Sequence, residues 1–283
     1  MRPATGRLRR KRADTYALVL DAAGVPYVLE RIPGGWLILV EEEDFEKAAS
    51  EIAAYRSENP PLARFPAPDA PSGYSGALAA LLLFCFYLRL GPFDQNPAIL
   101  AAYGSDAERI LDGQIFRAVT SLFLHGDFLH LLGNMAGCLV FGSAVARTAG
   151  YGAGWLLILA TGFLGNLLTA LAYGGGHLSG GASTAVFGAI GLLGGFRLGP
   201  PGSPLAPRNP AAWMVLGSGV LFLALLGNSP EADFSAHFFG YASGVLVGLA
   251  YVRIFSYPLP RRWQAACLYT AAVAVFASFV PKG

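Results

Sequence analysis

The sequence predicts an all-α, polytopic membrane protein of seven transmembrane helices, preceded by a small α+β soluble domain. Of its 283 residues, 54% are hydrophobic and 13% are charged, whereas roughly a quarter of an average soluble domain is charged. No Asp or Glu occurs from Phe128 to Pro230, and none follows Asp233. Ionisable groups must avoid hydrocarbon, so most of the chain is expected to lie in a lipid bilayer.

The composition also argues against several other classes of protein. The net charge is only +2, and the basic residues stand at the ends of apolar runs without interleaved aromatics, so nucleic-acid binding is not expected. Cys85, Cys138 and Cys267 lie in apolar segments without metal-like spacing, and we expect buried apolar side chains, no metal and no cofactor. The basic run RLRRKR precedes charged sequence rather than an apolar core, so no cleaved signal peptide is predicted.

A cytoplasmic α+β domain is predicted for residues 1–60. ADTYALVLDAA has helical spacing, VPYVLERI and GWLILVE flank a Pro-Gly-Gly turn as two strands would, and DFEKAASEIAAYR has a helix start and helix-forming residues. This domain contains no constellation typical of an active site, and a regulatory or partner-binding role is the remaining interpretation. Residues 61–73 are rich in Pro and Ala, as in a semi-rigid linker.

The transmembrane domain is predicted for residues 74–283 from its apolar runs. Several runs are shorter than the roughly 20 residues of a simple spanning helix, so their ends should lie below the membrane surface or continue into buried loops. The seven predicted helices are Tyr74–Leu90, Leu129–Val145, Trp155–Tyr173, Ala182–Phe196, Ala211–Leu226, Ala236–Ile254 and Trp263–Val280.

The basic residues predict the orientation, because they favour the cytoplasmic side of a membrane. The N-terminus is therefore expected inside and the C-terminus outside, with Arg89, Arg109, Arg117 and Lys282 as exceptions on the outer side. The membrane is most simply the plasma membrane of a bacterium, since no organelle-targeting pattern is present. On the inner side lie the N-terminal run, Arg147, Arg197, Arg208, Arg253, Arg261 and Arg262.

Four polar residues in the apolar runs are candidates for function, because polar groups at membrane depth are costly. His130 and Asn134 lie four residues apart at the start of the second helix, hence on one face. Ser183 begins the fourth helix and His237 begins the sixth. Even-numbered helices run inward from the outside, so all four side chains should reach one depth just below the outer surface.

This set of residues is suited to acyl transfer. A serine hydroxyl needs a neighbouring base to become a good nucleophile, and neutral histidine serves near pH 7. Only Glu231 and Asp233 lie near His237 in sequence, in an expected loop, so a Ser/His dyad is predicted rather than a triad. His130, the amide of Asn134 and the backbone N–H of Ser183 are the candidate donors to an oxyanion.

Glycines predict how the two helices of the dyad would approach each other. Small residues on one face allow helix backbones to come close in lipid, which would bring Ser183 and His237 within hydrogen-bond reach. The glycines concerned are Gly188, Gly191, Gly194 and Gly195 in the fourth helix and Gly240, Gly244 and Gly248 in the sixth.

The segments HLLGNM, GASTAVFG and AHFFGYASG resemble the three signature motifs of the rhomboid intramembrane proteases, in their order and on membrane helices. The resemblance covers roughly residues 74–280 and implies a rhomboid-like bundle, a six-helix core with one added C-terminal helix. It implies Ser183 as nucleophile, His237 as base, and His130 with Asn134 as oxyanion donors. It also implies a water-accessible cavity open to the outside and a substrate that is itself a transmembrane segment, cleaved near its outer end.

The connection between the first two helices is similar to the long first loop of that family, which lies partly in the membrane. Phe116-Arg117 stands where the family usually has Trp-Arg, and this departure concerns the packing of the loop. His125 matches a position that supports the loop structurally. His177 is expected to be an ordinary loop residue. The family resemblance suggests that the fifth helix and the loop from Gly227 to Ser235 move when a substrate enters.

Two other functions remain as alternatives. A non-catalytic relative would bind transmembrane helices for quality control or trafficking, but it would be expected to lack Ser183 or His237. A transporter or channel usually carries an intramembrane carboxylate or lysine along its path, and no acidic residue occurs in the helices after Asp127. The sequence leaves open the natural substrate, the cleavage site and the oligomeric state.

Overall fold

The computed structural model describes residues 1–59, 75–199, 217–221, 224, 233–255 and 258–280. The chain divides into two compact units, Met1–Arg64 and Phe65–Gly283. The predicted linker at residues 61–73 lies outside the described residues. So do most of the predicted fifth helix and most of the 227–235 loop, although residues 217–221 are helical.

The first unit is a three-stranded antiparallel sheet with two helices. It contains a helix, a hairpin and a helix in the order read from the sequence, and it adds a short strand, β1, paired with the free edge of β3 to give the order β1-β3-β2. Leu20, Ile38 and Val40 have no solvent exposure and centre its core. Its elements are β1 Arg2–Pro3, α1 Arg10–Ala22, β2 Val28–Ile32, β3 Gly35–Val40 and α2 Phe45–Glu58.

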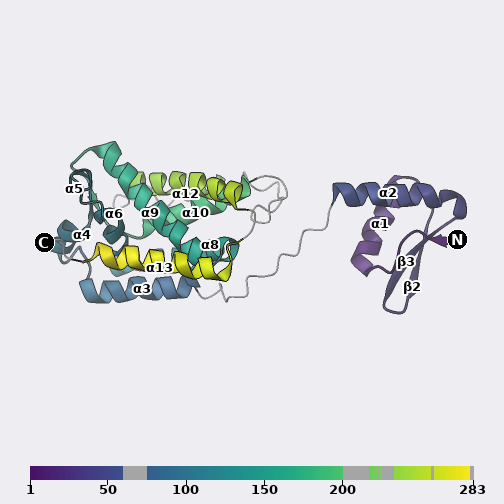
Figure 1. Ribbon diagram of the computed structural model, residues 1–283, viewed down its shortest axis with the longest axis horizontal. Helices are drawn as coiled ribbons and strands as arrows, with labels where there is room; N and C mark the ends of the chain where they lie inside the picture. The colour runs from purple at the N-terminus through teal and green to yellow at the C-terminus, as the bar shows by residue number, and fades with distance from the viewer. Residues whose placement is uncertain (60–74, 200–216, 222–223, 225–232, 256–257, 281–283) are drawn as a thin grey trace. The chain divides into compact units, whose positions relative to one another are not determined.

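The second unit is a helix bundle (Figure 1). Three of its described helical stretches are long and apolar enough to cross a membrane: Phe128–Ala149, Tyr151–Tyr173 and Phe234–Ile254. The first contains a π-helical turn, and Ser75–Leu90 is a shorter apolar helix. The count of seven helices stays a prediction. The main helices are α3 Ser75–Leu90, α7 Phe128–Gly137, α8 Ser143–Ala149, α9 Tyr151–Tyr173, α10 Ser183–Arg197, α12 Phe234–Ile254 and α13 Arg261–Ser278.

Helix α10 lies in the middle of this bundle and packs along α12 and α9 (Figure 1). A Cβ atom added at Gly191 would overlap the carbonyl oxygen of Tyr241, and one at Gly244 would overlap that of Gly188. A Cβ atom at Gly248 would come to 2.7 Å from the carbonyl oxygen of Leu192. The two glycine faces therefore meet, as the sequence predicted, and the backbones of α10 and α12 touch directly.

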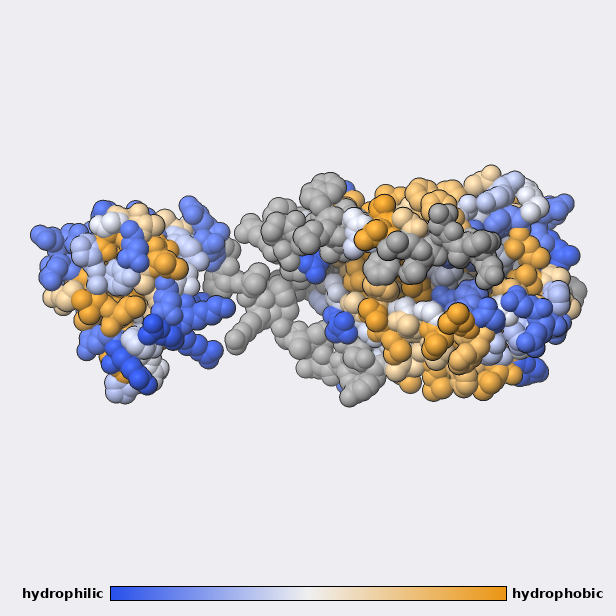
Figure 2. Space-filling model, turned by 180° about the vertical axis from the view of Figure 1, so that it is seen from behind, coloured by the Kyte–Doolittle hydropathy of each residue, from blue (hydrophilic) through white to orange (hydrophobic). Residues whose placement is uncertain are grey.

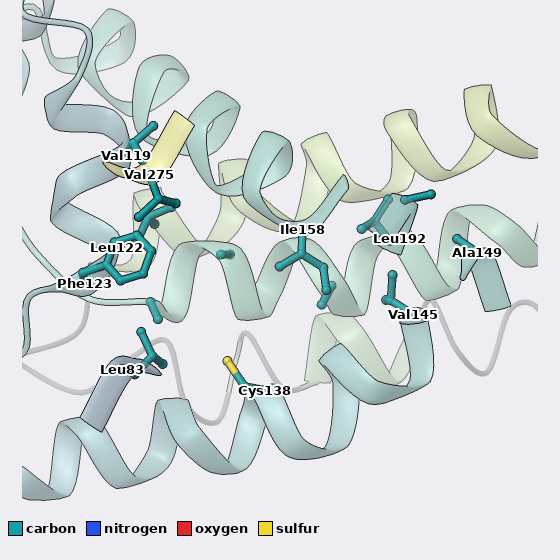
Figure 3. Packing of buried hydrophobic residues seen from close by; sticks show 14 of the residues in the cluster. Leu83, Val119, Leu122, Phe123, Cys138, Val145, Ala149, Ile158, Leu192 and Val275 are labelled. Atoms are coloured by element: carbon teal, nitrogen blue, oxygen red, sulfur yellow. The ribbon is translucent and has the colours of Figure 1, made fainter. Parts of the chain in front are cut away.

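Apolar side chains lie both in the interior of the bundle and on its surface. In the interior, Leu83 of α3, Ile158 of α9, Leu192 of α10 and Val275 of α13 belong to one buried cluster (Figure 3). On the outside, Figure 2 shows apolar side chains over much of the visible face of this unit. Exposed apolar residues on several helices are what a lipid-facing surface requires; they include Leu78, Leu129, Leu246 and Phe276.

The three cysteines do not share one environment. Cys138 is buried in the interior cluster, as predicted, and Cys267 is half-buried. Cys85 is exposed, so its predicted burial is wrong. The reason is that α3 packs with one side only, where Ala80 and Leu83 are buried, whereas Leu78, Leu81 and Leu82 are exposed.

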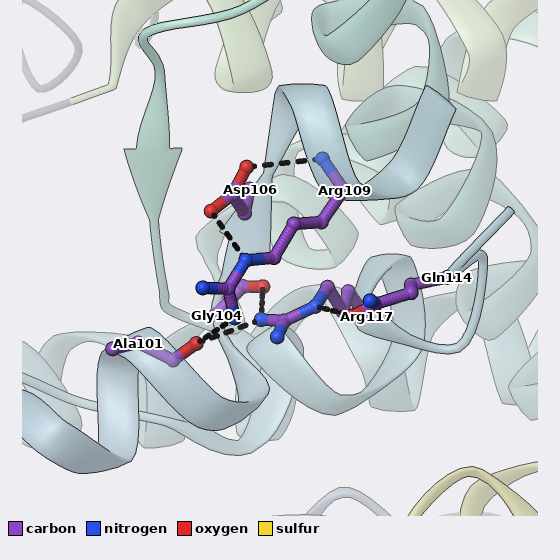
Figure 4. A network of polar contacts seen from close by, with 6 residues as sticks. All are labelled: Ala101, Gly104, Asp106, Arg109, Gln114 and Arg117. Atoms are coloured by element: carbon purple, nitrogen blue, oxygen red, sulfur yellow. Dashed lines mark hydrogen bonds and ion pairs between the residues drawn. The ribbon is translucent and has the colours of Figure 1, made fainter. Parts of the chain in front are cut away.

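The connection between α3 and α7 is ordered by Arg117, whose side chain is buried (Figure 4). Its Nε donates to Oε1 of Gln114 at 2.7 Å, and its Nη1 donates to the carbonyl oxygens of Ala101 and Gly104 at 3.1 and 3.2 Å. The guanidinium thus ties together three turns of one loop. This connection contains the short helices α4 Pro97–Tyr103, α5 Ala107–Leu111 and α6 Arg117–Thr120.

A two-residue ladder joins that connection to the segment leading into α10. Strand β4, Ser105–Asp106, pairs antiparallel with β5, Leu178–Ser179. The N–H of Ala107 also donates to the carbonyl oxygen of His177 at 2.9 Å. The loop before α10 is therefore held in place by backbone hydrogen bonds to the connection between α3 and α7.

Candidate active site

Ser183 is the first residue of α10, at the point where a glycine-rich loop turns into the helix. Gly181 has a φ of 143°, which side chains with a Cβ atom rarely allow. Its N–H donates to the carbonyl oxygen of Ser121 at 2.9 Å, which fixes the loop. The first N–H groups of a helix have no intrahelical acceptor, so Ser183 stands where backbone donors and the positive end of the helix dipole are available.

His237 lies in the first turn of α12, which begins after Asp233. The Asp233 side chain caps that helix by accepting from the backbone N–H of Ala236 at 3.0 Å. The His237 side chain is buried, and its Nε2 lies 2.7 Å from Oγ of Ser183. Two residues 54 positions apart in sequence are thus in direct hydrogen-bond contact.

The ring of His237 is held by an aromatic contact. Phe187, one turn after Ser183 on α10, lies against it with ring centroids 4.5 Å apart and planes at 27°. The Nδ1 atom of His237 is buried and has no protein hydrogen-bond partner among the residues that the structure describes. Within that part of the chain, no carboxylate forms a hydrogen bond with this atom.

His130 borders the same space from α7. That helix is capped by Asp127, whose Oδ1 accepts from the N–H of His130 at 2.8 Å. A Cβ atom placed on Gly181 would lie 2.7 Å from Nε2 of His130 and 3.5 Å from Oγ of Ser183. Gly181 therefore lets the imidazole of His130 come close to the serine.

Asn134 lies one helical turn further along α7 and is buried. Its Nδ2 donates to the carbonyl oxygen of His130, its own helix neighbour, at 3.1 Å. The structure therefore brings Ser183, His237 and His130 together, and it places Asn134 beside His130.

His125 precedes α7 and is almost fully buried, with its ring centroid 5.1 Å from that of His130. Burial, and then the neighbouring His130, lowers the pKa of His125 to about 3, against smaller opposing effects of Phe123 and Asp127. The ring is thus neutral at physiological pH, which fits a packing role in the loop. Among the described residues, no group of three or more His, Cys, Asp or Glu side chains is arranged to hold a metal ion.

Two contacts of this site were not read from the sequence. The stacking of Phe187 on His237 has one sequence signal, since Phe187 is four residues after Ser183 and so shares its helix face. His177 is not an ordinary loop residue: its Nε2 lies 3.1 Å from Oδ2 of Asp233. No sequence pattern joins these two residues, because the fold brings the two loops together.

Comparisons with known proteins agree on one family. The family model described as "Rhomboid domain" matches residues 112–254, half of the chain. RHOMBOID-like protein 5 of Arabidopsis thaliana is 29% identical over 160 residues, covering 56% of this chain and 50% of that protein. Rhomboid-type serine protease 2 of Emericella nidulans is 31% identical over 150 residues, covering 53% and 29%.

A relative that is named as inactive is also similar. Inactive rhomboid protein 2 of Homo sapiens is 29% identical over 170 residues, covering 58% of this chain and 19% of that protein. The chain spans half or less of the length of these curated relatives. The similarity therefore covers only part of each relative.

Proposed function

The chain belongs to the rhomboid family, and on that premise we propose that it is an intramembrane serine endopeptidase. It cleaves transmembrane segments of other membrane proteins near their outer ends. The observation that carries the proposal is the 2.7 Å contact between Oγ of Ser183 and Nε2 of His237. A nucleophile within hydrogen-bond reach of a base is the geometric signature of covalent catalysis.

In the proposed reaction, Nε2 of His237 accepts the proton of the Ser183 hydroxyl as Oγ attacks the substrate's peptide carbonyl. The histidinium then gives this proton to the leaving amine, which releases one product and leaves an ester on Ser183. His237 next deprotonates a water molecule, whose oxygen attacks the ester carbonyl. The histidinium then returns this proton to Oγ of Ser183 as the carboxylic acid product leaves. Because Nδ1 of His237 lacks a carboxylate partner in the described part of the chain, the pair acts as a dyad.

The oxyanion formed in the first step is stabilised by the start of α10 and by α7. The backbone N–H of Ser183 is one donor. The N–H of Gly126 points at Nδ1 of His130, at 3.5 Å, which favours the tautomer with the proton on Nε2, the atom that borders Gly181. Asn134 contributes the N–H that it does not donate to His130. Losing one such donor typically costs about a hundredfold to a thousandfold in rate.

The apolar helices and the rhomboid domain indicate a multi-pass membrane protein in a lipid bilayer. We place it in a plasma membrane, with the N-terminus in the cytoplasm, the C-terminus outside, and the dyad near the outer surface. The distribution of basic residues supports this orientation. The first unit then acts from the cytoplasm in regulation or partner binding.

A non-catalytic, helix-binding rhomboid-like protein is the second candidate. The similarity to Inactive rhomboid protein 2 of Homo sapiens favours it. The contact between Ser183 and His237 favours the enzyme instead.

One experiment separates the two candidates. The detergent-solubilised protein is incubated with a fluorophosphonate probe and, separately, with a model transmembrane substrate. The enzyme requires covalent labelling and cleavage by the wild type, and loss of both in Ser183→Ala and His237→Ala. Wild-type protein that is folded but neither labelled nor active supports the non-catalytic candidate. Labelling that persists in either variant refutes the dyad.

A further inference from the structure

A second polar cluster lies next to the dyad, formed by His177, Asp233, Tyr173 and Ser235. Nε2 of His177 lies 3.1 Å from Oδ2 of Asp233, and both side chains are largely buried, with 14% and 16% exposure. The other carboxylate oxygen of Asp233 accepts from the N–H of Ala236. A single carboxylate thus serves both as the cap of α12 and as the partner of a histidine from another segment.

His177 is itself fixed from two directions. The ring of Tyr173, at the end of α9, lies against it with centroids 4.3 Å apart and planes at 34°. The backbone carbonyl of His177 accepts from the N–H of Ala107 at 2.9 Å. The hydroxyl of Tyr173 lies 3.0 Å from Oγ of Ser235, a second link between the end of α9 and the start of α12.

The charge of Asp233 suits this position. Burial alone would raise the pKa of Asp233, but its contacts with His177, with the N–H of Ala236 and with Ser179 lower the pKa below its ordinary value. The carboxylate is therefore ionised at the N-terminus of α12, where a negative charge stabilises a helix. Its Oδ2 atom contacts His177, whereas Nδ1 of His237 has no hydrogen-bond partner in the described part of the chain.

The contact between His177 and Asp233 matters because both residues lie close in sequence to the proposed catalytic pair. His177 precedes Ser183 by six residues in the loop that leads into α10, and Asp233 precedes His237 by four residues. The contact therefore joins the segment that carries the proposed nucleophile to the segment that carries the proposed base. A shift of about 1 Å between catalytic groups can cost about a hundredfold in rate, so a link at this place matters for the chemistry.

We propose that His177 and Asp233 are positioning residues, which hold the first turn of α12 against the loop before α10 and so keep the His237 ring at hydrogen-bond distance from Ser183. This inference rests on the proposed function, because it assigns a role within the same site. Neither residue touches the substrate in this role. They act on the rate of proton transfer rather than on substrate affinity.

The test separates helix capping from the link itself. Asp233→Ser keeps an N-cap residue, since Ser caps helices about as well as Asp, but its side chain is too short to reach His177. His177→Phe keeps an aromatic ring against Tyr173 and removes the N–H group, whereas His177→Gln restores a neutral donor. Each full-length variant is assayed for fluorophosphonate labelling of Ser183 and for kcat and KM on a transmembrane substrate.

We expect Asp233→Ser and His177→Phe each to lower kcat and the labelling rate by about tenfold, with KM unchanged, as for the loss of one polar contact to a charged group. His177→Gln recovers most of the rate. The double variant Asp233→Ser with His177→Phe is no slower than either single variant, because one interaction is lost only once.

Wild-type rates in both single variants overturn the proposal, and so do additive losses in the double variant or a change confined to KM. If Asp233→Ser fails to fold, the pair His177→Phe and His177→Gln decides, since both leave the cap of α12 intact. The proposed function fails separately, through absence of labelling in the wild type. Labelled wild type with unaffected variants rejects the positioning role alone.

Discussion

The imidazole of His237 lies nearly parallel to the ring of Phe187, with centroids 4.5 Å apart. Phe187 and Ser183 belong to the same face of α10, so one helix supplies both the hydroxyl that His237 contacts and the surface that its ring rests on. The orientation of the proposed base thus depends on packing, because its Nδ1 atom has no hydrogen-bond partner among the described residues.

We therefore expect Phe187→Ala to slow fluorophosphonate labelling of Ser183 by about twofold to tenfold, the range for losing one aromatic pair. The matched control is Phe196→Ala on the same helix. Phe196 is also buried, but its ring neighbour is Tyr251, with centroids 5.9 Å apart. Phe196→Ala should lower stability while the folded protein is labelled at the wild-type rate. Equal slowing in both variants would argue against a specific role of Phe187.

The contact between α10 and α12 makes Gly244→Ala a severe change. The added Cβ atom would overlap the carbonyl oxygen of Gly188 and lie 2.9 Å from the Cα atom of Gly191. We expect a loss of about 1–3 kcal/mol in the free energy of unfolding and at least a tenfold loss of labelling, because the helices must move apart.

Gly133→Ala on α7 is the control, since a Cβ atom there meets nothing within 4 Å. Thermal unfolding in detergent and the labelling rate are measured for both variants. Similar behaviour of the two would show that the close approach of α10 and α12 is unimportant.

A buried glutamine joins α13 to the start of α9. Oε1 of Gln264 accepts from the N–H groups of Gly152 and Ala153, both at 2.8 Å, and its Nε2 donates to the carbonyl oxygens of Ala149 and Leu259. Gln264→Leu would leave at least two buried N–H groups without an acceptor. We expect a loss of about 3 kcal/mol or more in stability, because each such group costs about 1–3 kcal/mol.

Thr270→Val on the same helix is the comparison for Gln264→Leu. Its hydroxyl donates to the carbonyl oxygen of Ala266 at an exposed position, so its loss should change stability by no more than about 0.5 kcal/mol. Equilibrium unfolding in detergent micelles measures both. A Gln264→Leu variant as stable as Thr270→Val would contradict the role given to the amide.

His125 predicts a dependence of stability on pH. Its pKa falls from 6.5 to about 3 on folding, so below pH 6.5 the unfolded chain binds a proton that the folded chain does not. The stability associated with the neutral ring is complete above about pH 6.5 and is lost as the pH falls towards 3, by up to about 1.4 kcal/mol per pH unit.

His125→Leu should flatten the slope of unfolding free energy against pH between 6 and 4, relative to the wild type. His177→Gln, which removes a different histidine, should leave this part of the slope in place. An unchanged slope in His125→Leu would show that another group is responsible.

The position of the proposed site predicts the effect of a truncation. Ser183, His237, His130 and Asn134 all belong to the unit Phe65–Gly283. Deleting residues 1–70 should therefore leave peptidase activity on a model transmembrane substrate largely intact. Complete inactivation of a truncated protein that is still folded would mean that the first unit contributes to catalysis directly.

Much of the helical framework could be read from the sequence because hydropathy acts locally. The predicted runs Tyr74–Leu90 and Ala236–Ile254 differ from α3 and α12 by one and two residues at one end. The predicted run Leu129–Val145 ends four residues too early, because the helical structure continues through a π-helical turn to Ala149. Runs of apolar residues fix where a helix lies, whereas its ends depend on caps and neighbours.

The sequence by itself determined which polar groups are available at membrane depth and which helix faces are smooth enough to touch. Both follow from residue type and periodicity, so Ser183 and His237 could be selected before any contact was known. The tertiary structure alone decided the Phe187 support, the Gln264 bridge and the contact of His177 with Asp233. These interactions join loops and helices far apart in sequence, and their geometry exists only once the helices have packed.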